Sequence, residues 1–290
     1  MTFLALIIAL SLLQYWGSGS PVHMDHWFHE LVRKLSGSGL SVSLQFALAV
    51  LLPALLVLWV QTLVAGMLFG AISLVLMVFV LLYGFGRGDF EALVGQYREY
   101  CQRGDFEAAY LFAREEIPGA AGEERPSGPE QLHRWMKERI CYMGFERWFG
   151  VIFYFAILGP AGALAYRLLH LYGELDEDAA PAATVSRVRF LVDWVPVRLL
   201  VFAFALTGDW VGSREQVMTS LQDTTTASPA VIADAAHAAL GLKATVFSDS
   251  NGDTGAFAEV GDWEINQLQS LLRRSAVAWV VVLSLLVLFV

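Results

Sequence analysis

Charged residues are scarce in this sequence and are unevenly placed. Only 16% of the 290 residues are charged, whereas 56% are hydrophobic. No charge occurs between Lys34 and Arg87, between Arg147 and Arg167, or from Ser275 to Val290. Soluble domains are rarely so apolar, and uncharged runs of this length suit helices of about 20 residues that cross a bilayer core. The sequence therefore excludes an ordinary soluble domain and predicts a multi-pass membrane protein.

Cysteine and basic residues are also few. The two cysteines, Cys101 and Cys141, lack the spacing of a disulfide framework or a metal site, so we expect both to be reduced and buried. The net charge of −9 gives no electrostatic reason to expect nucleic-acid binding. The first Lys or Arg is Arg33, so the apolar segment 1–16 lacks the positive region of a secretory signal. We interpret it as a short first membrane helix that the protein retains.

Motifs for nucleotide binding and nucleophilic hydrolysis are absent, with neither a Walker motif nor a Gly-x-Ser-x-Gly elbow. Asp249–Asp253 begins like a calcium loop, but Thr254 and Val260 stand where that loop needs Gly and Glu. His23 and His26 share a helix face and form a conceivable metal site, although we favour an interfacial helix that uses them as polar residues. We therefore expect no cofactor and no bound metal.

The predicted fold is all-α, a polytopic transmembrane helical bundle with helical cytoplasmic loops. Four apolar segments predict membrane helices: 42–63, 65–83, 149–168 and 276–290. Two further candidates are 1–16, which is short, and 190–206, which carries Asp193, Pro196 and Arg198. The resulting regions are 1–83 (with an amphipathic interfacial helix near 27–35), 84–148, 149–206, 207–275 and 276–290.

The loop 84–148 contains an internal repeat. Arg87-Gly88-Asp89-Phe90-Glu91-Ala92 recurs as Arg103-Gly104-Asp105-Phe106-Glu107-Ala108. In each copy Gly can end one helix, Asp can cap the next, and Glu favours its N-terminal dipole. We expect two short helices, which either dock a cytoplasmic protein through 87–116 or pack onto the helix predicted from Glu130 into the membrane.

The loop 207–275 has its own signals. Ser228-Pro229 predicts the start of a helix and Gly241 its end. Two apolar pairs, Val246-Phe247 and Phe257-Ala258, flank Asn251-Gly252 and predict a small hairpin.

The segment from Arg187 to Leu199 is the most informative. A charge deep in a bilayer costs at least ~2.5 kcal/mol, so Asp193 and Arg198 are expected either to pair or to face a polar cavity. Pro196 is expected to break the helix and to release a backbone carbonyl beside them. Either the two residues form a structural ion pair, or they line a ligand-binding pocket with Arg167.

The stretch from Phe153 to Arg167, with Gly159-Pro160 and Gly162, and the motif from Asp193 to Leu199 resemble the membrane synthetases of cobalamin biosynthesis (CobD/CbiB). Ser228-Pro229 and the run from Ala235 to Gly241 are similar to later signatures of that family. The resemblance implies an enzyme that joins an aminopropanol arm to the corrin ring.

Departures from that pattern resemble the AmpE branch of the superfamily instead. The synthetases pair two Asp where Arg189 and Phe190 stand here, and Asp193 replaces their Asn. The segment His170–Leu175, which includes Glu174, replaces another of their motifs, so Glu174 joins the candidate ligand-binding residues.

The AmpE resemblance implies a bacterial inner-membrane regulator of β-lactamase induction, linked to cell-wall recycling. We expect a non-catalytic modulator that binds an anionic ligand, such as a cell-wall fragment or a phospholipid headgroup, or a protein partner. The alternative is a membrane ligase or transferase acting on an amphiphilic or phosphorylated substrate.

The basic residues predict the orientation in the membrane. Segments 17–41, 84–148 and 207–275 carry 2, 9 and 4 Lys and Arg, against only Arg187 and Arg189 in the segments on the other side. Reporter fusions within 84–148 and 207–275 should therefore show cytoplasmic activity. Alkaline phosphatase activity from both loops would contradict this orientation.

Overall fold

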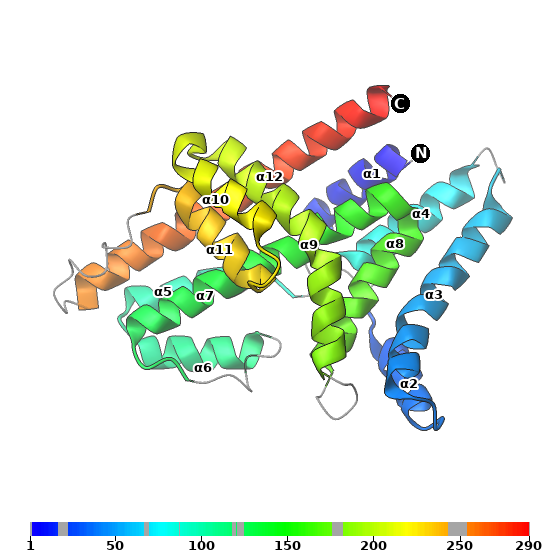
Figure 1. Cartoon of the computed structure of the whole chain (residues 1–290), viewed down its shortest axis with the longest axis horizontal. Helices are drawn as coiled ribbons and strands as arrows, with labels where there is room; N and C mark the ends of the chain where they lie inside the picture. Colours follow the sequence, from blue (N-terminus) through cyan, green and yellow to red (C-terminus); the bar gives the residue numbers. More distant parts are fainter. Residues whose placement is uncertain are drawn as a thin grey trace. The chain divides into compact units, whose positions relative to one another are not determined.

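The computed structural model describes residues 2–16, 23–66, 70–86, 88–117, 120, 125–175, 182–242 and 254–289. Within these ranges the regular structure is entirely helical, which confirms the all-α prediction. The helices, in chain order (Figure 1), are α1 (Thr2–Trp16), α2 (His26–Ser36), α3 (Val42–Val64), α4 (Ala71–Gly84), α5 (Phe90–Gln102), α6 (Phe106–Glu116), α7 (Pro129–Gly144), the π-helical turn η3 (Phe145–Phe149), α8 (Gly150–Glu174), α9 (Ala182–Thr207), α10 (Trp210–Gln222), α11 (Ser228–Ala239) and α12 (Thr254–Phe289).

The chain divides into two compact units. Unit 1 comprises residues 1–88, 146–196 and 282–290, and unit 2 comprises residues 89–145 and 197–281. In unit 1, α8 packs against α3 and α4, and α1 packs against α4. In unit 2, α7 packs against α6 and α11, and α10 packs against α11.

Three helices in the described ranges are long and apolar enough to cross a membrane: α3, the continuous helix Pro129–Glu174, and Ala183–Thr207 of α9. The predicted segments 42–63, 149–168 and 190–206 lie within these helices, whereas 1–16, 65–83 and 276–290 do not, so the predicted number of spans is wrong. α4 has 14 residues and, at 1.5 Å per residue, spans roughly 21 Å of a core about 30 Å thick. α1 is similarly short, and the described part of the segment 276–290, up to Phe289, belongs to α12, a helix that begins at Thr254 and also carries charges.

α3 shows the surface expected of a lipid-facing helix. Its buried residues, including Phe46, Ala49 and Val50, lie in its first half and pack with Leu168 and Tyr172 of α8. Large apolar side chains along the rest of the helix are exposed, among them Leu51, Leu52, Leu55, Leu56, Trp59 and Leu63. A helix that is apolar on all sides yet only partly covered by protein suits a hydrocarbon surrounding.

α2 contributes its apolar face to the same core. Phe28 and Val32 are buried there, with Leu35 packed against them, while Trp27 is partly exposed. The protein itself therefore covers part of the face that the sequence assigned to the membrane surface. Contact of the remaining face with the membrane stays a prediction.

α9 is continuous through Pro196, so the predicted helix break at this proline is wrong. Proline has no N–H to donate to the carbonyl four residues earlier, which leaves the Val192 carbonyl without its helical partner. The Tyr154 hydroxyl of α8 donates to that carbonyl oxygen at 2.8 Å. A side chain from the neighbouring helix thus replaces the missing bond.

The break lies in α8 instead. Gly159, directly before Pro160, has φ 68° and ψ −158°, a backbone conformation that is essentially restricted to glycine. A Cβ on Gly162 would lie 2.6 Å from the Tyr154 carbonyl oxygen. The two glycines thus allow α8 to fold back on its own preceding residues.

The two helices predicted from the repeat form in unit 2. Gly104 follows the end of α5 as predicted, whereas α4 already ends at Gly84, before Gly88. Asp89 caps α5 by accepting from the Ala92 N–H, and Asp105 caps α6 by accepting from the Ala108 N–H, both at 3.0 Å. The two helices pack against each other. Phe90 is buried and Phe106 packs edge-on against Phe257. Both repeated phenylalanines therefore contact the protein itself. Docking of a cytoplasmic protein to 87–116 stays a prediction, and it would have to use other side chains.

The second half of the predicted hairpin is helical. Phe257 and Ala258 lie in α12 and are buried, because Phe257 fills space between Phe106 and His133. Val246, Phe247 and the Asn251-Gly252 turn lie outside the described residues.

The bond across Pro196 yields a stability prediction. Tyr154→Phe keeps the aromatic ring but leaves the half-buried Val192 carbonyl unpaired, which should cost about 1 kcal/mol or more. In a Pro196→Ala background the residue-196 N–H can bond that carbonyl, so Tyr154→Phe should cost much less. Thermal unfolding in detergent of the four proteins measures the coupling. Equal losses in both backgrounds would show that Tyr154 does not compensate for the proline.

Candidate functional site

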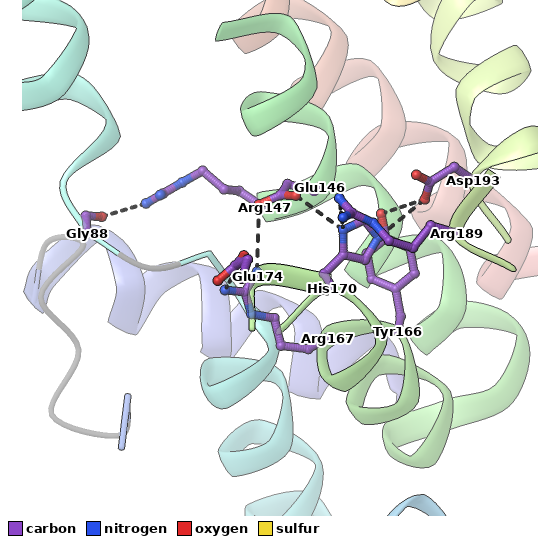
Figure 2. Close-up of polar contacts among 9 residues, drawn as sticks. All are labelled: Gly88, Glu146, Arg147, Tyr166, Arg167, His170, Glu174, Arg189 and Asp193. Carbon is purple, nitrogen blue, oxygen red and sulfur yellow. Dashed lines mark hydrogen bonds and ion pairs between the residues drawn. The ribbon is translucent and has the colours of Figure 1, made fainter. Parts of the chain in front are cut away.

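Ionisable side chains gather at one place in unit 1, among otherwise apolar helices (Figure 2). We call this group the polar cluster; it consists of Glu146, Tyr166, Arg167, His170, Glu174, Arg189 and Asp193. Three carboxylates face two guanidinium groups, so the cluster is electrically neutral when His170 carries a proton. Ionisable residues inside membrane helices are costly and commonly functional.

The π-helical turn η3 sets the direction of Glu146. A π-helical turn contains one extra residue, which changes the direction in which its side chains point, and such turns often occur at functional sites. Arg147, the next residue, points the other way and donates to the Gly88 carbonyl at 2.6 Å, as Figure 2 shows. Gly86 makes room for it, because a Cβ there would lie 2.0 Å from Arg147 Cγ. Glu146 is left facing the cluster.

His170 links two of the carboxylates. Its Nδ1 lies 3.2 Å from Glu146 Oε2 and its Nε2 lies 3.4 Å from Asp193 Oδ1. The Tyr166 hydroxyl donates to the same Asp193 oxygen at 3.1 Å. An imidazole with a carboxylate at each nitrogen can hold a proton between them, so the arrangement is chemically suited to proton relay or to fixing helix α9 against α8.

The ion pairs of Arg167 are longer than those of His170. Its side chain is only 2% exposed, with Nη1 3.8 Å from Glu146 Oε1 and Nη2 3.9 Å from Glu174 Oε1. Both distances exceed those of hydrogen bonds. Within the described part of the chain, the buried Nε and Nη1 atoms of Arg167 have no hydrogen-bond acceptor. A buried guanidinium in this state has unused capacity to donate to an oxyanion.

Small residues let the cluster form. Gly150 faces Tyr166, since a Cβ there would lie 2.2 Å from the Tyr166 hydroxyl. Gly173 likewise accommodates Arg189, whose Nη1 would be 2.6 Å from a Cβ. The Tyr154 ring stacks on Tyr166 with centroids 5.2 Å apart. Gly150 thus lets the two parts of α8 approach each other, and Gly173 lets Arg189 of α9 lie on the surface of α8.

Arg198, the centre of the predicted pocket, has partners in unit 2. Its Nε donates to the Ser220 carbonyl at 3.0 Å and its Nη2 to the Asp223 carbonyl at 2.6 Å. These carbonyls belong to the last turn of α10, where helical partners run out and a cation is favourable. Hydrogen bonds from Thr226 and Thr225 hold the pKa of the Asp223 carboxyl below its usual range. Arg198 therefore fastens the end of α10.

Of the residues predicted from sequence, the structure brings Arg167, Glu174 and Asp193 into the polar cluster. The sequence analysis missed Glu146, His170 and Arg189. One signal was available: Arg167, His170 and Glu174 recur at intervals of three and four and so share one helix face.

The two histidines considered as weak metal candidates have different surroundings. His23 Nε2 lies 3.0 Å from the Leu82 carbonyl oxygen, and the His26 side chain is exposed. No group of three or more His, Cys, Asp and Glu residues in the described ranges has an arrangement that could hold a metal ion.

Unit 2 contains a second buried ionic group. His133 Nε2 lies 3.1 Å from Glu264 Oε2, and Lys137 Nζ donates to the same oxygen at 2.8 Å. Burial raises the pKa of Glu264, but the hydrogen bonds from His133 and Lys137 outweigh it and leave that pKa below its usual range. A pocket of about 380 Å³ opens beside this group between α7, α11 and α12. Because Glu264 is already fully engaged, we regard the group as structural.

Comparison with known proteins identifies one family. The model of the family described as "Regulatory signalling modulator protein AmpE" matches residues 1–289. No curated protein and no solved structure matches. The wider kinship with CobD/CbiB stays a prediction.

The contacts of Arg198 predict a purely structural role for it. Arg198→Gln should lower the free energy of unfolding by about 1.5–3 kcal/mol, the usual worth of hydrogen bonds to a charged group. Arg214→Gln, at an exposed site on α10, is the matched control and should be nearly neutral. Adding Asp193→Asn should not restore the stability, because Asp193 has other partners. Restored stability in the double variant would instead indicate that Asp193 and Arg198 form an ion pair.

Proposed function

The chain belongs to the AmpE family of regulatory signalling modulators, and from this premise we propose that it senses an anionic ligand inside the bacterial inner membrane. The single observation that carries the proposal is Arg167, a buried guanidinium with unused hydrogen-bond donors. The regulated process that the family resemblance implies is β-lactamase induction linked to cell-wall recycling. The ligand is then a carboxylate or phosphate group of a cell-wall fragment or a lipid.

Electrostatics decide how such a ligand is accommodated. A fourth anion added to three carboxylates would be strongly repelled in a poorly screened interior. Glu174 is the carboxylate best placed to leave, because it ends α8 and is 28% exposed, whereas Asp193 is 1% exposed. We infer that the ligand takes the place of Glu174 beside Arg167, so that the charge of the cluster is conserved.

This exchange would couple binding of the ligand to a structural change in the protein. Releasing Glu174 frees the end of α8, which leads toward α9, while Glu146 and Asp193 keep His170 in place. A regulatory role agrees better with these contacts than the ligase or transferase alternative, because Glu146 and Asp193 already have partners within the protein. To transmit a signal, a ligand has to favour one of two arrangements of the protein. In the first arrangement Glu174 pairs with Arg167, and in the second the ligand has replaced Glu174.

Two variants of this pair should have opposite effects. Arg167→Lys keeps the charge but loses the planar fork, so it should abolish the effect of the protein on β-lactamase induction. Glu174→Gln removes the competing charge, so the same effect should appear at a lower concentration of inducer. Both are read from β-lactamase activity in cells that express the variant at the normal level.

Arg187→Gln is the control, since Arg187 is an exposed arginine near Arg189 on α9. It should leave induction unchanged. A folded Arg167→Lys variant with a normal response would disprove ligand binding at Arg167. Loss of the response in Glu174→Gln would show that Glu174 does not compete with the ligand.

A further inference from the structure

Helix α10 has three distinct sides. Ser213, Val217 and Ser220 are buried, and the helix packs against α11. Glu215, Thr219 and Gln222 form an exposed polar side. The third side is exposed and apolar, and it consists of Trp210, Val211, Met218 and Leu221 with Arg214 among them. These five positions share one side at 3.6 residues per turn.

The apolar side of α10 is unusually accessible. The exposed fraction of Val211 is 85%, and Met218 and Leu221 are each more than half exposed. Four apolar side chains on one side of a short helix form a patch of the kind that marks an interaction site.

This patch continues the outer face of α9. Leu199, Phe202 and Leu206 are exposed at intervals of three and four along α9, a helix long and apolar enough to cross a membrane. The rings of Phe202 and Trp210 meet edge-on with centroids 5.8 Å apart. The exposed apolar faces of α9 and α10 therefore meet at this pair of rings.

The corner between the two helices is fixed. Gly208 lies so close to α11 that a Cβ would be 2.4 Å from the Ala239 carbonyl oxygen. The Asp209 N–H donates to that same carbonyl at 2.8 Å, and the Asp209 carboxylate caps α10 by accepting from the Val211 and Gly212 N–H groups. Only two residues separate the helices, so α10 begins where α9 ends.

We propose that α10 is an interfacial helix, with its apolar side immersed in the bilayer that α9 crosses and Arg214 bound to phospholipid headgroup phosphates. A tryptophan at the end of a span and an arginine within an apolar stripe are both typical of the membrane–water boundary. An amphipathic helix that lies in this plane buries its apolar face and keeps its polar face in water. The inference requires α9 to span the membrane and is independent of any ligand at Arg167.

Spin labels test the proposal in the full-length protein reconstituted in nanodiscs of phosphatidylethanolamine and phosphatidylglycerol. Cys101 and Cys141 are buried, so single labels can be introduced at Val211→Cys and Met218→Cys. Glu215→Cys and Thr219→Cys, on the polar side of the same helix, are the matched controls. Leu199→Cys provides a reference for lipid exposure on α9.

Power saturation distinguishes the outcomes. We expect labels at 211, 218 and 199 to collide with oxygen and to lose contact with a water-soluble nickel complex, and labels at 215 and 219 to show the reverse. Arg214→Glu should make the label at 211 shallower in these anionic nanodiscs, and less so in phosphatidylcholine alone, where the choline cation offsets the charge of each phosphate.

Equal access of nickel to both sides of α10 would overturn the proposal. Shielding of 211 and 218 from both reagents would also overturn it, because protein and not lipid would then cover the patch. A water-exposed label at 199 would remove the membrane contact of α9 itself, and the proposal with it.

Discussion

Charge inside apolar helices is the constraint on which unit 1 depends. Every ionisable side chain there has to find its partner within the protein, because hydrocarbon offers none. Glu146, His170 and Asp193 satisfy this requirement as a chain, and Arg167 satisfies it with two carboxylates at ion-pair distance. The π-helical turn, the break at Gly159 and the small residues Gly150 and Gly173 all act to bring these side chains together.

The local signals in the sequence were sufficient for local structure. Asp89 and Asp105 predicted both helix starts in the repeat, since a capping carboxylate acts within a few residues. Apolar runs likewise predicted α3 and the helical class. They overestimated the spans because hydropathy does not fix where a helix begins or ends, as the 14 residues of α4 illustrate.

Tertiary contacts decided the rest. Pro196 predicted a break, yet the Tyr154 hydroxyl from another helix restores the lost bond. The sequence suggested that Arg198 pairs with the nearby Asp193. Its acceptors are instead backbone carbonyls such as that of Ser220, which lies 22 positions away in the chain. Phe257 was expected to lie in a strand of a hairpin, yet it lies in α12, where it packs against Phe106. The spacing of Arg167, His170 and Glu174 could have shown that they share a helix face. It could not have shown that Asp193 lies close to them.

The repeat in unit 2 has an evolutionary consequence. Each copy contains a glycine with positive φ, Gly88 or Gly104, followed by its own capping aspartate, and Asp105 follows Asp89 by 16 positions (105 minus 89). Such a unit can be duplicated without altering the helices on either side, since its boundaries are set from within. The repeat is therefore consistent with tandem duplication of a single capped helix, and insertion or deletion of one whole copy would leave the capping of the neighbouring copy intact.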